Sequence, residues 1–376
     1  MPRLSPPPQA PHPDVTNPRL RPGPASPRSP VAHRVAVPAE GRFAAILRHH
    51  ATPDPSMGLF VLRRLLTLAA TLAGASLVVF VVLEILPGNA AQVLLGPDAA
   101  PEAVAELATQ LGLDQPAPRR YAQWVAGLVS GDMGTSAAYG TPVAELVWER
   151  LALTVPLAVM AMALTTVLAL AAGLYAASHH RRWGDVGVMG LAQLGIALPN
   201  FWFAILLILL FSVKLQWFSA GGFPGWTEAA GGGVLPALQA LLLPAIALAV
   251  VQAAILARIT RSAVLDVLRE DFVRTARAKG LSRRAALWGH VLRNAMIPVV
   301  TVMGLQFANL LAGTIMVENV FYLPGLGRLI FQSIANRDLI VVRNCVMLLA
   351  ALVVVVNAVV DVLYAVIDPR VKAGAA

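Results

Sequence analysis

The stretch Arg274-Thr275-Ala276-Arg277-Ala278-Lys279-Gly280-Leu281-Ser282 lies in a basic loop, residues 258–296, between two apolar segments of membrane-spanning length. Helix-favouring residues precede Gly280, which can adopt the positive φ that ends a helix. Ser282 is a favourable N-cap for a second short helix that runs toward Asn294. The loop therefore predicts two helices that meet at a bend, a surface suited to docking another protein. An amphipathic helix lying on the bilayer surface is the alternative.

The composition indicates an all-α integral membrane protein. Hydrophobic residues make up 57% of the 376 residues and charged residues only 13%, and the mean hydropathy is +0.69. A soluble domain of this composition would expose far too much apolar surface. The net charge of +9 would also suit nucleic acid, but the basic residues cluster beside apolar segments, where they set membrane orientation. We therefore expect a lipid bilayer and no nucleic acid as partner.

Six segments are long enough to cross a bilayer, since one crossing needs roughly 20 apolar residues. They are residues 65–86, 151–177, 186–213, 241–257, 297–317 and 345–366. The first is longer than the roughly 7 to 15 apolar residues of a signal peptide. We therefore expect six transmembrane helices, the first of which is retained.

Charge in the connecting loops predicts the orientation. The external loop, residues 87–150, carries seven acids and three bases, whereas residues 258–296 carry nine bases and three acids. Because Lys and Arg favour the cytoplasmic side, the basic loop is expected inside the cell and both termini with it. The external loop contains one helical pattern, residues 101–111, which either caps the bundle or meets a soluble partner.

Residues 1–56 are rich in Pro and Arg and have few apolar clusters, a composition typical of disorder. Residues 57–376 then form the transmembrane domain. Met57, followed by two arginines and an apolar helix, also resembles a natural start. The intact mass of the native protein would decide whether translation begins there.

Residues that could support catalysis are scarce in the apolar segments. All seven histidines lie in the N-terminal extension or in loops, and the single Cys345 lies in an apolar run, so we expect no metal site and no intramembrane nucleophile. No Gly-Lys pair occurs, so a Walker A phosphate loop is absent from the sequence. We expect a non-catalytic chain without a bound cofactor, so that any ATP would have to be handled by a partner chain.

A few polar residues do fall within the predicted spans. Gln306, Asn309 and Gly313 are three and four positions apart and share a helix face, and so do Asn357 and Asp361. Such faces turn toward protein or a water-filled path. The residues are therefore candidates for a translocation path, with hydrogen bonds between helices as the more common role of such groups.

Seven sequence blocks occur in a specific order along residues 57–372. They are Leu111-Gly112-Leu113-Asp114-Gln115-Pro116, Gly131-Asp132-Met133-Gly134-Thr135-Ser136, the stretch quoted first, Leu292-Arg293-Asn294-Ala295, Val317-Glu318-Asn319-Val320-Phe321, Pro324-Gly325-Leu326-Gly327-Arg328 and Asp368-Pro369-Arg370. With them the chain resembles the inner-membrane permease subunits of binding-protein-dependent ABC importers, in the peptide/nickel branch of dipeptide and oligopeptide permease B type. The resemblance implies a type I ABC importer permease fold in the bacterial inner membrane.

The resemblance also implies a coupling site. The family's Glu-Ala-Ala loop, which contacts the ATPase, lies over Arg274-Thr275-Ala276, so that arginine replaces the glutamate and threonine the first alanine. The implied coupling residues are Thr275, Ala276, Gly280, Leu281, Ser282 and Ala285. The implied partners are a second homologous permease, two ATP-binding subunits and an extracytoplasmic solute-binding protein.

The function implied by this resemblance is ATP-driven import of dipeptides or oligopeptides. The same machinery carrying nickel or another small solute is an open alternative. An ion-coupled secondary transporter, suggested by Asp361 and Glu84, would need paired broken helices, which the sequence does not show. An intramembrane enzyme would lack its nucleophile and base.

Overall fold

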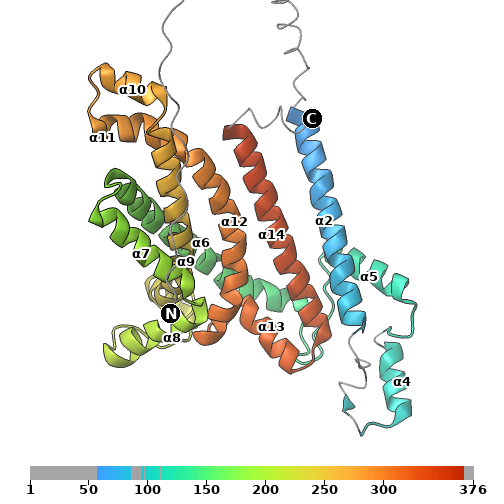
Figure 1. Ribbon diagram of the computed structural model, residues 1–376. Coiled ribbons are helices and arrows are strands. Elements are labelled where there is room, and N and C mark those ends of the chain that lie inside the picture. Colours follow the sequence, from blue (N-terminus) through green and yellow to red (C-terminus); the bar gives the residue numbers. More distant parts are fainter. Residues whose placement is uncertain (1–56, 86–90, 92–94, 97, 111, 368–376) are drawn as a thin grey trace, which may run out of the picture. The chain divides into compact units, whose positions relative to one another are not determined.

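The computed structural model describes residues 57–376 except 86–90, 92–94, 97, 111 and 368–376. These residues belong to one compact unit, Asp54–Ala376. The extension 1–56, for which we expect disorder, lies outside the described residues. Within the described part the structure is helical, apart from one isolated β-bridge between Thr135 and Pro142 (Figure 1).

Five long apolar helices account for five of the expected spans. They are α2 (Met57–Ile85), α6 (Val143–Ser178), α9 (Val234–Val267), α12 (Leu292–Val320) and α14 (Leu339–Ile367). Each extends beyond the predicted apolar segment at one end or both. With 36 residues, α6 is about 54 Å long at 1.5 Å per residue, which exceeds the roughly 30 Å hydrocarbon core. It must therefore tilt or project from the bilayer.

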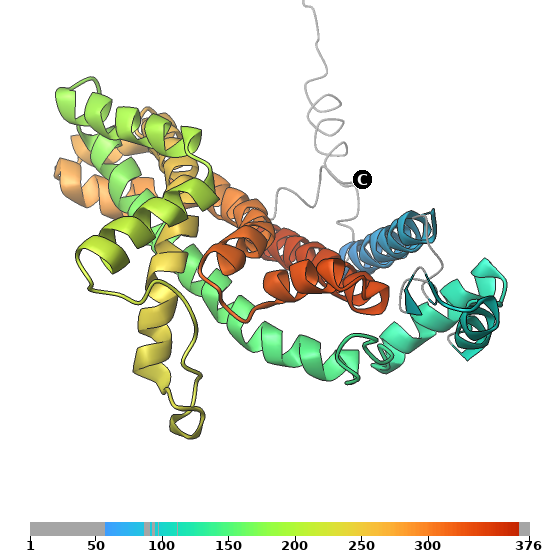
Figure 2. The same cartoon turned by 90° about the horizontal axis from the view of Figure 1, so that it is seen from below.

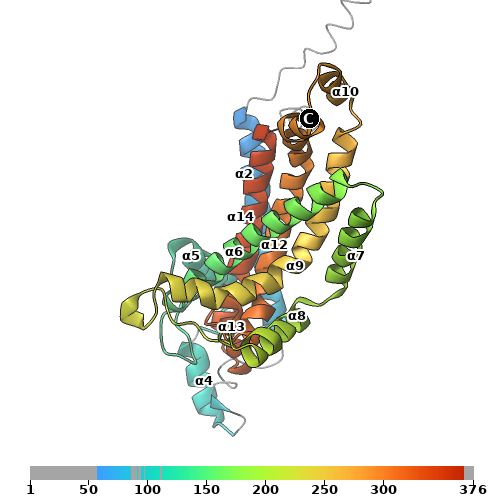
Figure 3. The same ribbon diagram turned by 90° about the vertical axis from the view of Figure 1, so that its left-hand side faces the viewer.

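The helix α9 contacts α6, α12, α7 and α8 (Figures 1 and 3). In its apolar 18-residue stretch, 67% is buried inside the protein, whereas the corresponding share for α2 is 11%. Small residues let α6 and α9 approach closely. A Cβ atom added to Gly173 would lie 2.8 Å from the Ala257 carbonyl oxygen, so this crossing depends on glycine.

The expected third span, residues 186–213, is not one straight helix. The chain forms α7 (Trp183–Ala197), turns, and continues as α8 (Asn200–Leu207) and the π-helical η1 (Ile208–Lys214), with an angle of 103° between the two parts. Pro199 explains the break, because proline lacks an amide hydrogen and restricts the residue before it. Leu198 is accordingly extended, with φ −88° and ψ 125°. The described helices thus give five candidate spans, or six if the bent pair is one span.

Shorter helices flank the spans. In the loop after α2 lie α4 (Pro101–Gln110) and α5 (Ala117–Ser130), seen at one side of Figure 2. The first confirms the helical pattern predicted for residues 101–111, whereas the second was not predicted. A further helix, α13 (Leu326–Ala335), joins α12 to α14 and was also not predicted.

Candidate functional site

The elbow, residues 271–291, is the bent segment between α9 and α12. It consists of α10 (Asp271–Ala278), a turn, α11 (Arg283–Ala286) and the π-helical turn η3 (Leu287–Val291). Gly280 has φ +97°, and the Ser282 hydroxyl accepts a hydrogen bond from the Ala285 amide at 3.2 Å. The predicted glycine bend and serine cap are both confirmed.

Two details of the elbow differ from the sequence prediction. The helix-favouring stretch that precedes Gly280 does not form one helix, because it is interrupted at residues 268–270, between α9 and α10. The second helix is not separate, since α11 continues through the π-helical turn η3 (Leu287–Val291) into α12. Displacement of α11 would therefore act directly on the end of a spanning helix.

The elbow has a packed side and an open side. Val273 and Val291 are buried in a cluster with α9 residues such as Val264, and Ala286 is buried as well. Among the predicted coupling residues, Thr275, Gly280, Ser282 and Ala285 are exposed, while Ala276 and Leu281 are half-buried. The apolar residues of α11 and η3 thus divide between internal packing and the surface.

Two aromatic residues on the open side were missed as site candidates. Phe272 is 43% exposed and Trp288 is 62% exposed, on the two arms of the elbow. Phe272 and Val273 form a single apolar pair between charged residues in the sequence, so no periodic apolar pattern marks Phe272. Exposed aromatic side chains are frequent anchors of protein interfaces.

An ion-pair cluster fixes α7 to α9 near the elbow. The Arg261 guanidinium donates two hydrogen bonds to the Asp185 carboxylate, at 2.6 and 2.7 Å, and His180 Nδ1 lies 3.3 Å from the same carboxylate. Arg283 Nη2 of α11 donates to the Ser178 carbonyl at 3.3 Å. The turn between α6 and α7 therefore ties α9 to the elbow.

We expect Asp185→Asn to lower the unfolding temperature of the purified protein, because Arg261 then loses its ionic partner. Removing one partner of a buried ion pair costs about 3–5 kcal/mol, and this pair, half-buried on the arginine side, should lie at or below the lower end. Thermal unfolding in detergent measures the effect. Asp271→Asn is the matched control, because its pair with Arg274 is exposed and should contribute little. Equal shifts in the two variants would contradict the prediction.

The predicted face of α12 is divided between different surroundings. Gln306 is buried, and its amide donates to the Gln252 carbonyl of α9 at 3.2 Å. Gly313 lies beside α8 and α9, whereas Asn309 is exposed. Gln306 thus acts as a link between helices, and Asn309 is the polar group of this set that the chain leaves accessible.

On α14 the two residues predicted to line a translocation path, Asn357 and Asp361, also have different surroundings. Asp361 forms an ion pair with Arg64 of α2. The Asn357 side-chain oxygen is buried and has no hydrogen-bond partner within the described part of the chain. Asp361 therefore has a structural partner in α2.

Glu318 is a buried acid that sequence reasoning did not select. Its carboxylate accepts hydrogen bonds from the Thr154 hydroxyl and the Gly327 amide, each at 2.7 Å. The Thr154 oxygen accepts a third hydrogen bond from the Leu326 amide at 2.9 Å. One carboxylate thus joins α12, α6 and the N-terminus of α13, where a negative charge is favourable.

The loop after α2 is held to α14 by a second polar network. The buried Asp338 carboxylate accepts hydrogen bonds from the Ser136 hydroxyl at 2.6 Å and the Ala138 amide at 3.1 Å. Asn344 accepts from the Trp124 indole at 2.9 Å and donates to the Met133 carbonyl at 2.8 Å. The block around Ser136 therefore has a packing role.

Five or six candidate spans among the described helices, together with the family matched below, make this chain a multi-pass protein of the bacterial inner membrane. The family described as "Binding-protein-dependent transport system inner membrane component" matches residues 169–373, and its N-terminal part matches residues 57–158. The chain belongs to this family, the permease subunits of ABC importers.

Relatives cover most of the chain. A permease protein of Brucella abortus, named for a peptide transport system, is 40% identical over 84% of this chain and 99% of its own length. The dipeptide transport system permease protein of Alkalihalophilus pseudofirmus is 37% identical over 83% and 99%. The glutathione transport system permease protein of Escherichia coli O6:H1 is 41% identical over 83% and 98%.

One solved structure is also similar. The crystal structure of an amino acid ABC transporter with histidines aligns at a TM-score of 0.43 and 17% identity, over 60% of this chain and 94% of that chain. At this TM-score the alignment does not show that the two proteins share one fold.

Proposed function

We propose that this chain forms half of a translocation pathway for dipeptides or oligopeptides and is driven by a separate ATPase. The observation that carries the proposal is the set of relatives named for peptide, dipeptide and glutathione transport, which align over 98% or more of their own lengths. Glutathione is itself a small peptide. The shared chemistry of these cargoes is therefore a short peptide.

The elbow is the proposed contact with the ATPase. Its open side presents Thr275, Gly280, Ser282 and Ala285 with the aromatic groups of Phe272 and Trp288. After α11 the chain continues without a break through η3 into the spanning helix α12. Closure of two ATP-binding subunits would push on the elbow and rock α12 and α9 as rigid elements. In this proposal the chain itself is non-catalytic, and ATP and Mg reside on the partners.

The proposed assembly contains a second homologous permease, two ATP-binding subunits and an extracytoplasmic solute-binding protein. The basic elbow faces the cytoplasm, as the excess of Lys and Arg favours. The acidic loop with α4 and α5 then faces the binding protein. Asn309 is the best candidate for a group on the translocation path, because it is polar, accessible and on a spanning helix.

Cross-linking tests the coupling proposal. In the assembled importer, the variant Ala285→Cys should be cross-linked to the ATP-binding subunit by a thiol-reactive cross-linker, because Ala285 is exposed at the bend. The only native cysteine, Cys345, is buried and should give little background. Glu228→Cys is the control, since Glu228 is exposed outside the elbow, in η2 (Glu228–Ala230). Absence of the Ala285 cross-link in an actively transporting complex would contradict the proposal.

Uptake assays test the substrate class. Proteoliposomes with the complete importer and its binding protein should accumulate labelled dialanine only when ATP is supplied. An excess of unlabelled peptide should compete, and nickel should not. Nickel uptake without peptide competition would favour the alternative cargo. Uptake driven by an ion gradient in the absence of the ATPase would indicate a secondary transporter, which would need paired broken helices, whereas one bent pair is found among the described helices.

A further inference from the structure

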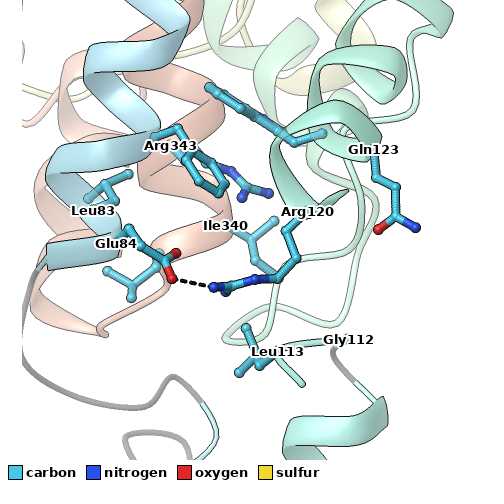
Figure 4. Close-up of a pocket in the computed structure, with 11 residues that line it drawn as sticks. Leu83, Glu84, Gly112, Leu113, Arg120, Gln123, Ile340 and Arg343 are labelled. Carbon is cyan, nitrogen blue, oxygen red and sulfur yellow. Dashed lines mark hydrogen bonds and ion pairs between the residues drawn. The ribbon is translucent and has the colours of Figure 1, made fainter. Parts of the chain in front are cut away.

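A cavity of about 260 Å³ lies between α2, α5 and α14 (Figure 4). Its charged side chains are Glu84 of α2, Arg120 of α5 and Arg343 of α14. Glu84 and Arg120 form an ion pair, so the lining keeps one net positive charge, carried by Arg343. The space is several times the roughly 30 Å³ that a water molecule occupies in the liquid. A small polar group therefore fits.

Arg343 forms no ion pair within the described part of the chain, although Glu84, the ion-pair partner of Arg120, also attracts its charge. Its guanidinium lies 4.7 Å from the centre of the Trp124 ring. The Nε atoms of Arg343 and Arg120 are both buried without a hydrogen-bond partner. Leaving a buried donor unpaired costs about 1–3 kcal/mol and more for a charged group. The cavity is nevertheless lined by both guanidinium groups, and no ion pair neutralises that of Arg343 in the described part of the chain.

The Arg343 side chain lies over an aromatic ring that is itself fixed by its neighbours. Trp124 stacks near the guanidinium and donates its indole hydrogen to Asn344, the next residue on α14. Phe80 packs near Trp124 with ring centres 6.2 Å apart. The arginine is thus oriented before any ligand arrives, which lowers the entropy cost of binding.

We propose that this cavity binds an oxyanion, a phosphate or carboxylate group, between Arg343 and Arg120. Arginine suits these groups because its planar fork donates parallel hydrogen bonds to two oxygens. The cavity adjoins Glu84, one residue before α2 ends at Ile85, and the end of a spanning helix lies near the lipid headgroups. The oxyanion can come from a phospholipid headgroup or from a soluble anion.

Binding is tested on the full-length chain in nanodiscs of zwitterionic phosphatidylcholine. The probes are dioctanoylphosphatidylglycerol, inorganic phosphate and acetate, with dioctanoylphosphatidylcholine as the neutral lipid control. A bound anion raises the unfolding temperature in a concentration-dependent way. We expect at least one anionic probe to raise the unfolding temperature. In the variant Arg343→Gln, the apparent affinity for that probe should be at least tenfold weaker. Arg343→Lys should retain part of the affinity.

The matched control is Arg328→Gln. Arg328 also stacks on an aromatic ring, that of Tyr322 at 5.0 Å, but lies on α13 outside the cavity. An effect of phosphatidylglycerol alone identifies a headgroup site, and an effect of phosphate or acetate as well identifies a site for soluble anions. The proposal is overturned if no anionic probe acts, or if Arg343→Gln and Arg328→Gln respond like the unmodified chain.

Discussion

Glu318→Ala is expected to lower the unfolding temperature of the protein in detergent and the amount of protein found in the membrane. The change leaves the Thr154 hydroxyl and the Gly327 amide without their acceptor in a fully buried site. Hydrogen bonds to a charged group contribute about 1.5–3 kcal/mol each, so the loss of these two should be about 3–6 kcal/mol. Thermal unfolding and membrane immunoblots measure the two effects. Glu228→Ala, an exposed acid in η2, should behave like the unmodified protein.

A glycine beside Glu318 allows a sharper version of this test. A Cβ atom added at Gly325 would lie within 2.5 Å of the Glu318 carboxylate atoms, so Gly325→Ala should also destabilise the protein. Removing the Glu318 carboxylate makes room for that methyl group. The double variant should therefore lose less stability than the sum of the single losses. Additive losses would show that Glu318 and Gly325 act independently.

Gly280→Val is expected to reduce uptake to background while leaving insertion of the protein unchanged. Gly280 has φ +97°, which a β-branched residue rarely adopts. A Cβ atom at this position would meet no neighbour within 4 Å, so the change strains the elbow without disturbing internal packing. Uptake by proteoliposomes and the yield of membrane protein are measured together.

Two further variants identify the cause of that loss. Gly280→Asn should retain part of the uptake, because asparagine tolerates the left-handed region better than valine. Gly140→Val imposes a similar strain outside the elbow, where φ is +65° and a Cβ atom would also have open space. It should leave cross-linking from Ala285 intact. Normal uptake by Gly280→Val would count against the coupling role of the elbow.

The parts of the fold that sequence predicts well depend on local patterns. Apolar length identified five spans, and single residues with strong backbone preferences, Gly280 and Ser282, marked the bend and the cap. The break at Pro199 was equally local. It was missed because the continuous apolar run of residues 186–213 was given more weight than the proline.

The contacts that organise the interior could not be predicted, because they join residues far apart in the chain. Glu318 meets Thr154, 164 positions away, and Arg261 meets Asp185, 76 positions away. Helical spacing placed Gln306 and Asn309 on one face, yet the neighbour α9 covers the first and leaves the second exposed. Periodicity defines a face, whereas its surroundings depend on which helix packs against it.

The pairing of α2 with α14 bears on how the protein is made. The first spanning helix is complete about 250 residues before its neighbour α14 begins, and the ion-pair partner of its Arg64 is Asp361 on α14. During synthesis α2 is therefore in the membrane before α14 is available to pack against it. If translation stopped before α14, α2 would lack its neighbour and Arg64 would lack its ion-pair partner Asp361. Such a truncated chain would be a substrate for membrane quality-control proteases.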